Sequence, residues 1–368
     1  MLVDHLVLAG GGHTHALLLK RWAMYPHLRP NCLITLVNRD STTIYSGMFP
    51  GLVAAQYELE EVLIDLRCLC DRAQVSFIVG EISLVDFAEN RLLLNDRPPI
   101  SFTKLSLDIG SETLVNDETD RLIQNKNLVC PIKPFRECYN WIQYCESTNS
   151  SRASLPFTVV GSGLAALEIV FALRRRWPSR QLRLQSYHEI LKPRFRKALA
   201  FSKIELTDPT SVIKGFALIC TGSKGPNWLE KSGLKVNSAG RVITNTTLEV
   251  EGRKNVFAVG DCGLIATHSR PPSGVWAVRA AKPLARNIER SFRGKSLLKW
   301  RPQLFALQLV GAFSHRRSLS AWSLWRGWTF GPHPLLWKLK KGIDMKFMAD
   351  FVRTPLMRNK RKIVACRG

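Results

Sequence analysis

The stretch VVGSGLAALE at residues 159–168 decides the fold, because a short apolar run passes through two glycines into the start of a helix. The same arrangement occurs once earlier, as VLAGGGHTHA at residues 7–16. Glycine-rich turns between a buried strand and a helix are typical of sites that seat the pyrophosphate of a dinucleotide. Two such turns indicate two dinucleotides, and a protein that binds two dinucleotides usually passes electrons between them.

The composition favours a globular intracellular protein. A length of 368 residues predicts two domains plus an extension, and 45% hydrophobic residues are enough to bury a core. The nine cysteines include no C-x-x-C pair, which favours free thiols over a disulfide framework or a metal site. Neither a signal peptide nor an apolar run of the roughly 18 residues that a membrane span needs is present. We therefore expect a cytoplasmic protein, free or peripheral on the cytoplasmic face of a membrane.

The first turn follows a predicted strand at residues 4–9 and precedes an apolar helix and a second buried strand at 32–38. Gly10 stands where a tight bend is needed, and Gly12 stands where the backbone must approach the pyrophosphate. The pyrophosphate would accept hydrogen bonds from the backbone N–H groups of Gly11, Gly12 and His13 at the start of the helix. For a single turn of this kind, glycines that only permit tight packing are the alternative interpretation.

The first turn departs from the G-x-G-x-x-G pattern in two places. His15 replaces the third glycine, and both His15 and His13 are expected to be packing residues rather than acids or bases. Asn38 and Arg39 stand where an acidic residue usually binds the adenosine ribose, although Asn38 can still form a hydrogen bond to a hydroxyl.

The second turn predicts a pyridine nucleotide site. Its pattern is G-x-G-x-x-A, formed by Gly161, Ser162, Gly163 and Ala166. No acidic residue follows the next strand, which is expected to end near Tyr187, while Arg194 and Arg196 are a weak indication of NADPH. Only about 30 residues separate that strand from the segment ICTG, so the unit is expected to be shortened. Loss of nucleotide binding is therefore left open.

Two later segments resemble motifs of a known superfamily. The segments ALICTGS at 217–223 and NVFAVGDCG at 255–263 are similar to the late motifs of the FAD-dependent pyridine nucleotide-disulfide oxidoreductases. Within that superfamily the chain resembles the branch of type II NADH dehydrogenases and sulfide:quinone reductases. It resembles most closely the flavoprotein found alone or fused ahead of selenide, water dikinase. Besides AGGGHTHA, the residues that carry this resemblance are YSGMFPG at 45–51, LSLDIGS at 105–111, Ile132, Lys133 and Pro134, and the segment from Ser273.

The resemblance implies an α/β fold with two Rossmann-like, three-layer ββα domains, the second inserted in the first. The FAD-binding domain would comprise residues 1–130 and 250–290, the NAD(P)-binding domain 131–249, and a basic helical extension 291–368. Asp261 would hold the ribityl chain of FAD, and the backbone near Ile82 would contact the adenine. The remaining cofactor-binding residues implied are Gly110, Gly222 and Gly260. Residues 75–96 are expected to form a meander with a turn at Glu89 and Asn90.

The function implied is transfer of a hydride from NAD(P)H to FAD, and of electrons from there to a quinone or similar acceptor. The segment YSGMFPG lies where disulfide reductases carry their redox cysteines, so no dithiol relay is available. Glu168 matches a glutamate that positions a ribose or relays a proton in the type II dehydrogenases, with an ordinary carboxylate favoured by the helix dipole as the alternative. Lys133 would compensate the negative charge of an anionic reduced flavin, with a solvated lysine as the alternative.

Three further interpretations stay open. Trp276 is either near the flavin or a core residue. A sulfide- or selenium-linked oxidoreductase is disfavoured because no cysteine pair is evidently placed beside the flavin, with Cys130 and Cys262 as the thiols to check. A flavin-binding partner protein whose second site has decayed is the rival of another class, and a homodimer is left open.

The C-terminal region indicates an anionic partner. From residue 291 onward it carries 17 Lys and Arg against Asp344 and Asp350 only, within a net charge of +24 for the chain. Basic and aromatic residues together with an amphipathic helix favour an anionic membrane surface, and nucleic acid is disfavoured because no binding motif accompanies the charge. The residues expected on one apolar face are Leu336, Leu339, Ile343, Phe347 and Phe351. Helices packed on the flavin domain with solvated lysines are the alternative.

Overall fold

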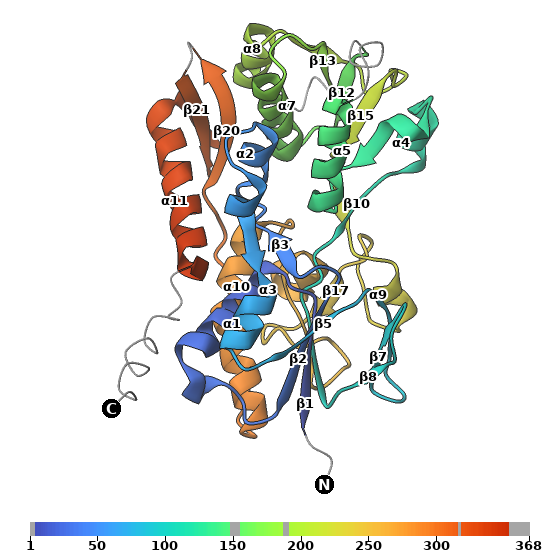
Figure 1. Cartoon of the computed structure of the whole chain (residues 1–368), viewed down its shortest axis with the longest axis vertical. Helices are drawn as coiled ribbons and strands as arrows, with labels where there is room; N and C mark the ends of the chain where they lie inside the picture. Colours follow the sequence, from blue (N-terminus) through green and yellow to red (C-terminus); the bar gives the residue numbers. More distant parts are fainter. Residues whose placement is uncertain (1–3, 148–154, 187–190, 316–317, 353–368) are drawn as a thin grey trace, which may run out of the picture.

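The computed structural model describes residues 4–147, 155–186, 191–315 and 318–352. Two parallel sheets stand one above the other, and the C-terminal segment lies beside the upper unit, with its last described turn reaching a helix of the lower unit (Figure 1). Tyr187 and the basic residues after 352 lie outside the described ranges.

The first sheet contains both strands of the first predicted unit. Its order is β18-β9-β1-β2-β5, and all neighbouring strands are parallel. The strands are β1 (His5–Ala9), β2 (Leu33–Asn38), β5 (Ser76–Val79), β9 (Lys104–Leu107) and β18 (Val256–Ala258). The glycine turn leads from β1 into α1 (His13–Met24), so the helix begins three residues earlier than its apolar run.

The first sheet is the middle of three layers, as expected. Leu6 and Leu8 face the helical side, where α1 packs against α10 (Gly274–Phe292). Val7 and Leu105 face the opposite side and join a core with residues of the antiparallel meander. The meander strands are β6 (Ile82–Asp86), β7 (Arg91–Leu94) and β8 (Ile100–Ser101). Asn90 adopts a positive φ of 51° between β6 and β7, which confirms the predicted turn.

The second sheet belongs to the inserted unit and is also parallel, with the order β11-β15-β12-β13-β14. Its strands are β11 (Val129–Pro131), β12 (Phe157–Val160), β13 (Leu182–Gln185), β14 (Ile204–Thr207) and β15 (Phe216–Ile219). The second turn leads from β12 into α7 (Leu164–Arg176). The short connection to ICTG still contains α8 (Pro193–Phe201) and β14, so this unit keeps a complete five-stranded sheet.

The residues that follow β15 pack again on the core of the first domain. A short pair joins β10 (Glu112–Thr113) to β16 (Ser223–Lys224) between the two sheets. Leu229, Val242 and Val250 then share a core with Val7 and Leu105 of the first sheet. The boundary at residue 249 stays a prediction about folding units, while the packing divides the chain nearer to residue 223.

The C-terminal segment is only partly helical. It begins as a three-stranded antiparallel sheet and ends in one long helix, and the element bounds are β20 (Gln308–His315), β21 (Ser318–Trp325), β22 (Trp328–His333) and α11 (Pro334–Val352). The tryptophans at 322, 325 and 328 therefore lie on strands, where alternate residues face opposite sides. Trp322 is fully buried, whereas Trp328 is 71% exposed.

The predicted apolar face of α11 is divided between two sides of the helix. Phe347 and Phe351 pack inward, but Leu339 and Ile343 are exposed to solvent. The prediction that all five apolar residues share one face was therefore wrong, because Lys340 and the buried Asp344 point inward instead.

Candidate active site

A cavity of about 390 Å³ lies at the carboxyl edge of the first sheet. Most of the residues predicted to bind FAD line it, from the first glycine turn to the late GD motif. They are Gly10, Gly11, Gly12, His13, Asn38, Arg39, Ile82, Gly110, Gly260 and Asp261, with Lys133 beside them. In an open parallel sheet, ligands bind outside the carboxyl ends of the strands. The position and lining of the cavity therefore fit an FAD molecule.

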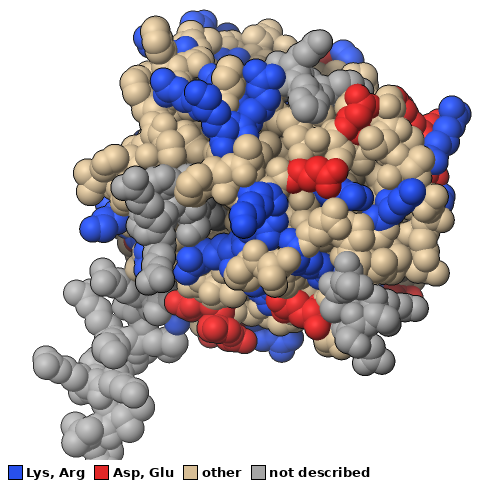
Figure 2. Space-filling view, turned by 90° about the horizontal axis from the view of Figure 1, so that it is seen from above, with Lys and Arg blue, Asp and Glu red and all other residues tan. Residues whose placement is uncertain are grey.

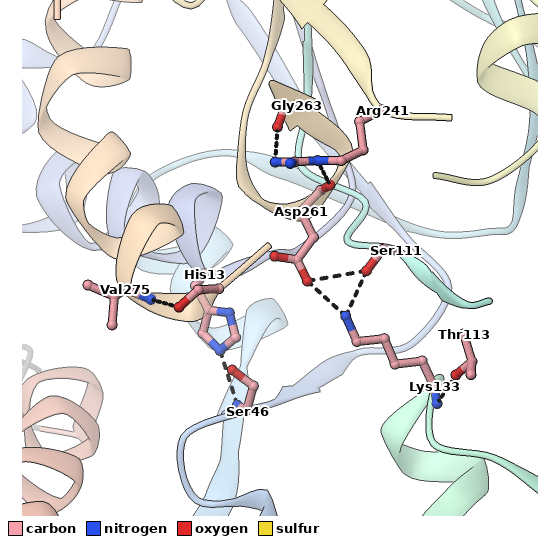
Figure 3. Close-up of polar contacts among 10 residues, drawn as sticks. His13, Ser46, Ser111, Thr113, Lys133, Arg241, Asp261, Gly263 and Val275 are labelled. Carbon is pink, nitrogen blue, oxygen red and sulfur yellow. Dashed lines mark hydrogen bonds and ion pairs between the residues drawn. The ribbon is translucent and has the colours of Figure 1, made fainter. Parts of the chain in front are cut away.

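Asp261 and Lys133, which both line the cavity, form an ion pair (Figure 3). Lys133 Nζ lies 2.8 Å from Asp261 Oδ2 and donates to Ser111 Oγ at 2.7 Å. Burial raises the pKa of Asp261, but Lys133 and the Ser111 hydroxyl outweigh it and hold the pKa below its ordinary value. Arg241 donates to the backbone carbonyl of Asp261 at 2.9 Å. An ionised Asp261 is thus fixed where it can accept a hydroxyl of the ribityl chain.

His13 faces the cavity from the first turn of α1. Its Nε2 accepts the backbone N–H of Ser46 at 3.3 Å, so the ring proton of the neutral form lies on Nδ1 (Figure 3). Burial lowers its pKa, which favours this neutral form. Nearby, the Ser273 hydroxyl caps the N-terminus of α10 by accepting the Val275 N–H.

The first turn has few free donors. The N–H of Gly11 donates to Asn38 Oδ1 at 2.8 Å, and that of Gly12 donates to the backbone carbonyl of Asp108 at 3.0 Å. Among the described residues, no partner is present for the N–H of His13. His13 is therefore the donor of the predicted three that is available to a pyrophosphate.

His15 explains why the third glycine is not needed. Its ring is fully buried, donates from Nδ1 to the carbonyl of Gly10 at 2.7 Å, and accepts at Nε2 from the Ser106 hydroxyl at 2.8 Å. Burial lowers the pKa of His15 to about 4, so the ring is neutral at physiological pH. His15 thus clamps the turn to β9 as a packing residue.

The residues expected near the adenosine lie at the rim of the cavity. Asn38 Nδ2 donates to the carbonyl of Asp40 at 2.8 Å, but the amide retains hydrogen-bonding capacity for a ribose hydroxyl. Arg39 pairs at 3.1 Å with Glu137, which belongs to the inserted unit. Gly110 adopts a φ of 75°, and no atom lies within 4 Å of the place where its Cβ would be, so a ligand can approach the backbone closely there.

The second turn is open by comparison. Gly161 adopts a φ of 148°, and a Cβ there would lie 2.5 Å from the carbonyl of Cys220. Gly163 and Gly222 have nothing within 4 Å of the place where a Cβ would be. Ala166 is buried at the start of α7. These residues leave the space above the N-terminus of α7 free, as a nucleotide pyrophosphate requires.

The described groups beside the second turn are neutral, and residues 187–190, which come next in the chain, lie outside the described ranges. The Ser162 hydroxyl lies 3.0 Å from that of Ser186, which directly follows β13. Arg194, which was considered for a 2′-phosphate, instead donates to the carbonyl of Thr329 in the β21–β22 hairpin at 2.6 Å. Lys192 Nζ donates to the carbonyl of Gly327 in the same hairpin at 2.7 Å. In this conformation Arg194 holds the hairpin.

Glu168 belongs to a buried charged cluster with Lys340 and Asp344. Its Oε1 accepts the N–H of Gly311 in β20 at 2.7 Å and lies 3.8 Å from Lys340 Nζ. Lys340 also donates to the carbonyl of Gly47 at 2.8 Å and contacts Asp344 at 3.4 Å. Burial raises the pKa of Glu168, and Lys340 only partly offsets it. Burial opposes ionisation of Lys340, but Glu168 and Asp344 raise its pKa.

Helix α11, which carries Lys340 and Asp344, also covers the segment YSGMFPG at residues 45–51. Tyr45 stacks on Phe347 with ring centroids 4.3 Å apart, and its hydroxyl bonds to Asp344. Burial and the Asp344 charge raise the pKa of Tyr45, so its hydroxyl stays protonated. Where disulfide reductases have redox cysteines, this chain therefore places α11.

The two cysteines considered for sulfur or selenium chemistry are buried and outside the lining of the cavity. Cys262 donates to the carbonyl of Val259 at 3.1 Å, and burial raises its pKa to about 12. Cys130 donates to the carbonyl of Pro131 at 3.3 Å. Trp276 also lies outside the cavity lining, with its ring between the guanidinium groups of Arg270 and Arg279. In the described ranges, no group of three or more His, Cys, Asp and Glu side chains could hold a metal ion.

Sequence reasoning missed Asp108, Asp344 and Lys340. Asp108 was visible as an acidic residue at the carboxyl end of an apolar strand, where ligand-binding groups gather. Lys340 and Asp344 were visible as an i, i+4 pair, but nothing local shows that they face inward.

No family model matches the chain. Among curated proteins it is 21% identical over 340 residues to the NADH dehydrogenase-like protein YutJ of Bacillus subtilis, covering 84% of this chain and 90% of that protein. It is 24% identical over 311 residues to the type II NADH:quinone oxidoreductase of Staphylococcus epidermidis, covering 72% and 76% respectively.

Among solved structures, the chain is similar to the sulfide:quinone oxidoreductase of Aquifex aeolicus. The TM-score is 0.74 at 16% identity, over 95% of this chain and 92% of that one. At this identity the likeness shows the shared fold. Fold, turns and similarities fit the FAD-dependent pyridine nucleotide-disulfide oxidoreductase superfamily, which confirms the resemblance that the motifs indicated.

Proposed function

We propose that the chain is an FAD-dependent oxidoreductase that accepts a hydride from NAD(P)H and passes electrons to a quinone or similar acceptor. The observation that carries this proposal is the pair of glycine turns at the carboxyl edges of two parallel sheets. One turn opens on the cavity around Asp261, and the other opens on free space at Gly163 and Gly222. The names of the curated relatives support the same class of reaction.

FAD, when bound, supplies the redox chemistry, and the protein residues bind and orient the reactants. The His13 N–H would bind the diphosphate, and Asp261, kept ionised by Lys133, would bind the ribityl chain. The second turn would bind the diphosphate of NAD(P)H at the N-terminus of α7. Burial raises the pKa of Glu168, so this carboxyl group retains a proton to higher pH than an exposed glutamate and would deliver it toward the acceptor.

A diffusible acceptor is favoured over a thiol. The loop 45–51 carries no cysteine, and its outer side is covered by Lys340 and Phe347 of α11. Cys130 and Cys262 are buried and hydrogen-bonded to backbone carbonyls, which argues against the sulfide- or selenium-linked alternative.

The outer side of α11 favours a membrane surface as the place where the acceptor arrives. Leu335, Leu339 and Ile343 are exposed at helical spacing, and Trp328 and Phe330 of β22 are exposed as well. On the end of the molecule seen in Figure 2, Lys and Arg cover more of the described surface than Asp and Glu do. Each basic residue near an anionic leaflet adds about 1 kcal/mol of attraction. No helix in the described part of the chain is long and apolar enough to cross a bilayer.

Rapid mixing of the purified flavoprotein with NADH and with NADPH tests the hydride donor. We expect bleaching of flavin absorbance with at least one nucleotide, and faster turnover with a quinone than without one. A flavoprotein that neither nucleotide bleaches would instead be the partner protein with a decayed second site.

Variants test the cofactor assignment. Asp261→Ala removes a charge-assisted hydrogen bond worth about 1.5 to 3 kcal/mol, so flavin content should fall, whereas Asp71→Asn, at an exposed position, should keep it. Wild-type protein that stays colourless after incubation with FAD would contradict the proposal.

Vesicle flotation tests the membrane surface. We expect the full-length chain to float with vesicles containing anionic lipid, less so as salt rises, and Leu339→Glu/Ile343→Glu to weaken flotation. Flotation that is absent at low salt would leave the exposed face of α11 without a membrane role.

A further inference from the structure

Asp108 occupies the start of the helix that should receive the flavin diphosphate. It follows β9, is 2% exposed, and its Oδ2 accepts the N–H of His15 at 2.9 Å. The same carboxylate also accepts the N–H of Thr14. A buried carboxylate of the protein thus uses two of the donors that a helix N-terminus offers to an anion.

The glycines on both sides of Asp108 touch its carboxylate. A Cβ on Gly12 would lie 2.4 Å from its oxygens, and a Cβ on Gly260 would lie 2.3 Å from Oδ1. Gly12 belongs to the first turn and Gly260 to the late GD motif. Asp108 is therefore packed between the two segments that line the cofactor cavity, and it cannot turn away without displacing one of them.

Little compensating charge faces Asp108. From α1 it is faced by His13 and His15, whose pKa values burial lowers. From the segment at residues 260–262 it is faced by the ionised Asp261 and by the Cys262 thiol, whose pKa burial raises to about 12. Lys133 is already paired with Asp261 at 2.8 Å. The guanidinium groups of Arg39 and Arg136 also line the cavity, but neither is among the charged groups that act on Asp108, so a diphosphate would add negative charge beside a carboxylate with no cation of its own.

We propose that Asp108 takes up a proton from solvent when the diphosphate of FAD binds, so that this side chain couples flavin affinity to pH. The inference rests on the proposed use of the cavity by FAD. A protonated Asp108 keeps an oxygen to accept the N–H groups of α1 and removes the repulsion between the two anions. Asp108 thereby acts as a positioning residue of the first turn rather than as a catalytic one.

The direction of the effect follows from linkage. Burial raises the pKa of Asp108 to about 6 in the flavin-free protein, and the diphosphate raises it further. Below pH 6 the proton is already present and affinity is highest. Above pH 6 the dissociation constant rises by up to about tenfold per pH unit, until the pKa of the complex is passed.

Calorimetric titration of FAD into the flavin-free full-length chain measures this proton directly. At pH 7.5, titrations in two buffers with different ionisation enthalpies should show uptake approaching one proton per FAD. Asp108→Asn should bind FAD without that proton and with an affinity independent of pH between 6 and 8. At pH 8 the variant should bind up to about 100-fold more tightly than the wild type. Asp71→Asn, an exposed carboxylate of the same domain, should behave as the wild type.

Uptake of no proton by the wild type, or equal uptake by Asp108→Asn, would overturn the inference. If Asp108→Asn does not fold, the infrared difference spectrum of the wild type with and without FAD decides, because a new protonated-carboxyl C=O band is expected on binding. Its absence would be equally decisive against the inference. A chain that binds no FAD at any pH would instead refute the proposed function, so the two failures are distinguishable.

Discussion

The two glycine turns share one sequence pattern but have different surroundings. The first is closed around a protein carboxylate: Gly12 touches Asp108, and most of its N–H groups already have partners. The second is open at Gly163, and its helix is instead held from the outside by the C-terminal segment through Glu168. A closed turn suits a resident cofactor, whereas an open turn suits a substrate that must enter and leave.

The difference shows how each turn is supported. Helix α1 packs against α10 inside its own domain. Helix α7 depends on a buried ion cluster with Lys340 of α11, a residue far along the chain. The inference is that the second turn is coupled to the C-terminal segment, and the first turn to protonation of Asp108.

The largest effect is expected from breaking the support of the second turn. Lys340→Met leaves Glu168 and Asp344 buried without their cation, which should cost about 3 to 5 kcal/mol of unfolding free energy in urea. Adding Glu168→Gln should recover part of the loss. Lys338→Met, exposed on the same helix, is the matched control. A loss below that of the control would show that the cluster does not support α7.

The next effect concerns the first turn and its pH dependence. The raised pKa of Asp108 means that its contribution to stability is full below its ordinary value of 3.8 and is lost as pH rises to about 6. Without flavin, the unfolding free energy of Asp108→Asn relative to the wild type should therefore rise by about 2 to 3 kcal/mol between pH 4 and pH 7. Urea unfolding at both pH values measures this gain. A difference between the two proteins that does not change with pH would contradict it.

A smaller effect is expected when a methyl group is added to each turn, because only the closed first turn lacks space for it. Gly12 and Gly163 are both N-caps with negative φ, so Ala at either loses the same capping preference. Gly12→Ala adds a clash with Asp108, which should lower the unfolding free energy by roughly a further 1 to 3 kcal/mol. The same clash should lower the flavin content. Gly163→Ala should keep the flavin, and its melting temperature should fall only by the capping contribution that both variants lose. Equal behaviour of the two variants would remove the distinction between the turns.

The smallest effect is expected at the open turn. Ser162→Ala breaks the contact with the Ser186 hydroxyl and should cost about 0.5 to 1.5 kcal/mol. The KM for NAD(P)H should change while the flavin-to-protein absorbance ratio stays constant. A loss of flavin in this variant would mean that the turns are not independent.

Much of the fold was predictable because its signals are local. The strand, glycine turn and helix recur at both predicted sites, since a sharp turn with close backbone approach needs glycine wherever it stands. The GD motif was expected to reach the cofactor site, and Asp261 lies in the cavity with the first turn. The tail was less predictable. Its tryptophans occupy strands because pairing with neighbouring strands, which sequence spacing does not show, outweighs local preference.

The sequence by itself determined where the two turns lie and which residues can form them, because glycine conformations and apolar periods are properties of short segments. Only the tertiary structure decided that Asp108 fills the start of α1, that Arg194 holds a hairpin, and that Lys340 and Asp344 face inward. Each of these depends on partners far apart in the chain. Burial and charge at such contacts arise from packing, so neither the pKa of Asp108 nor the support of Glu168 follows from the residues alone.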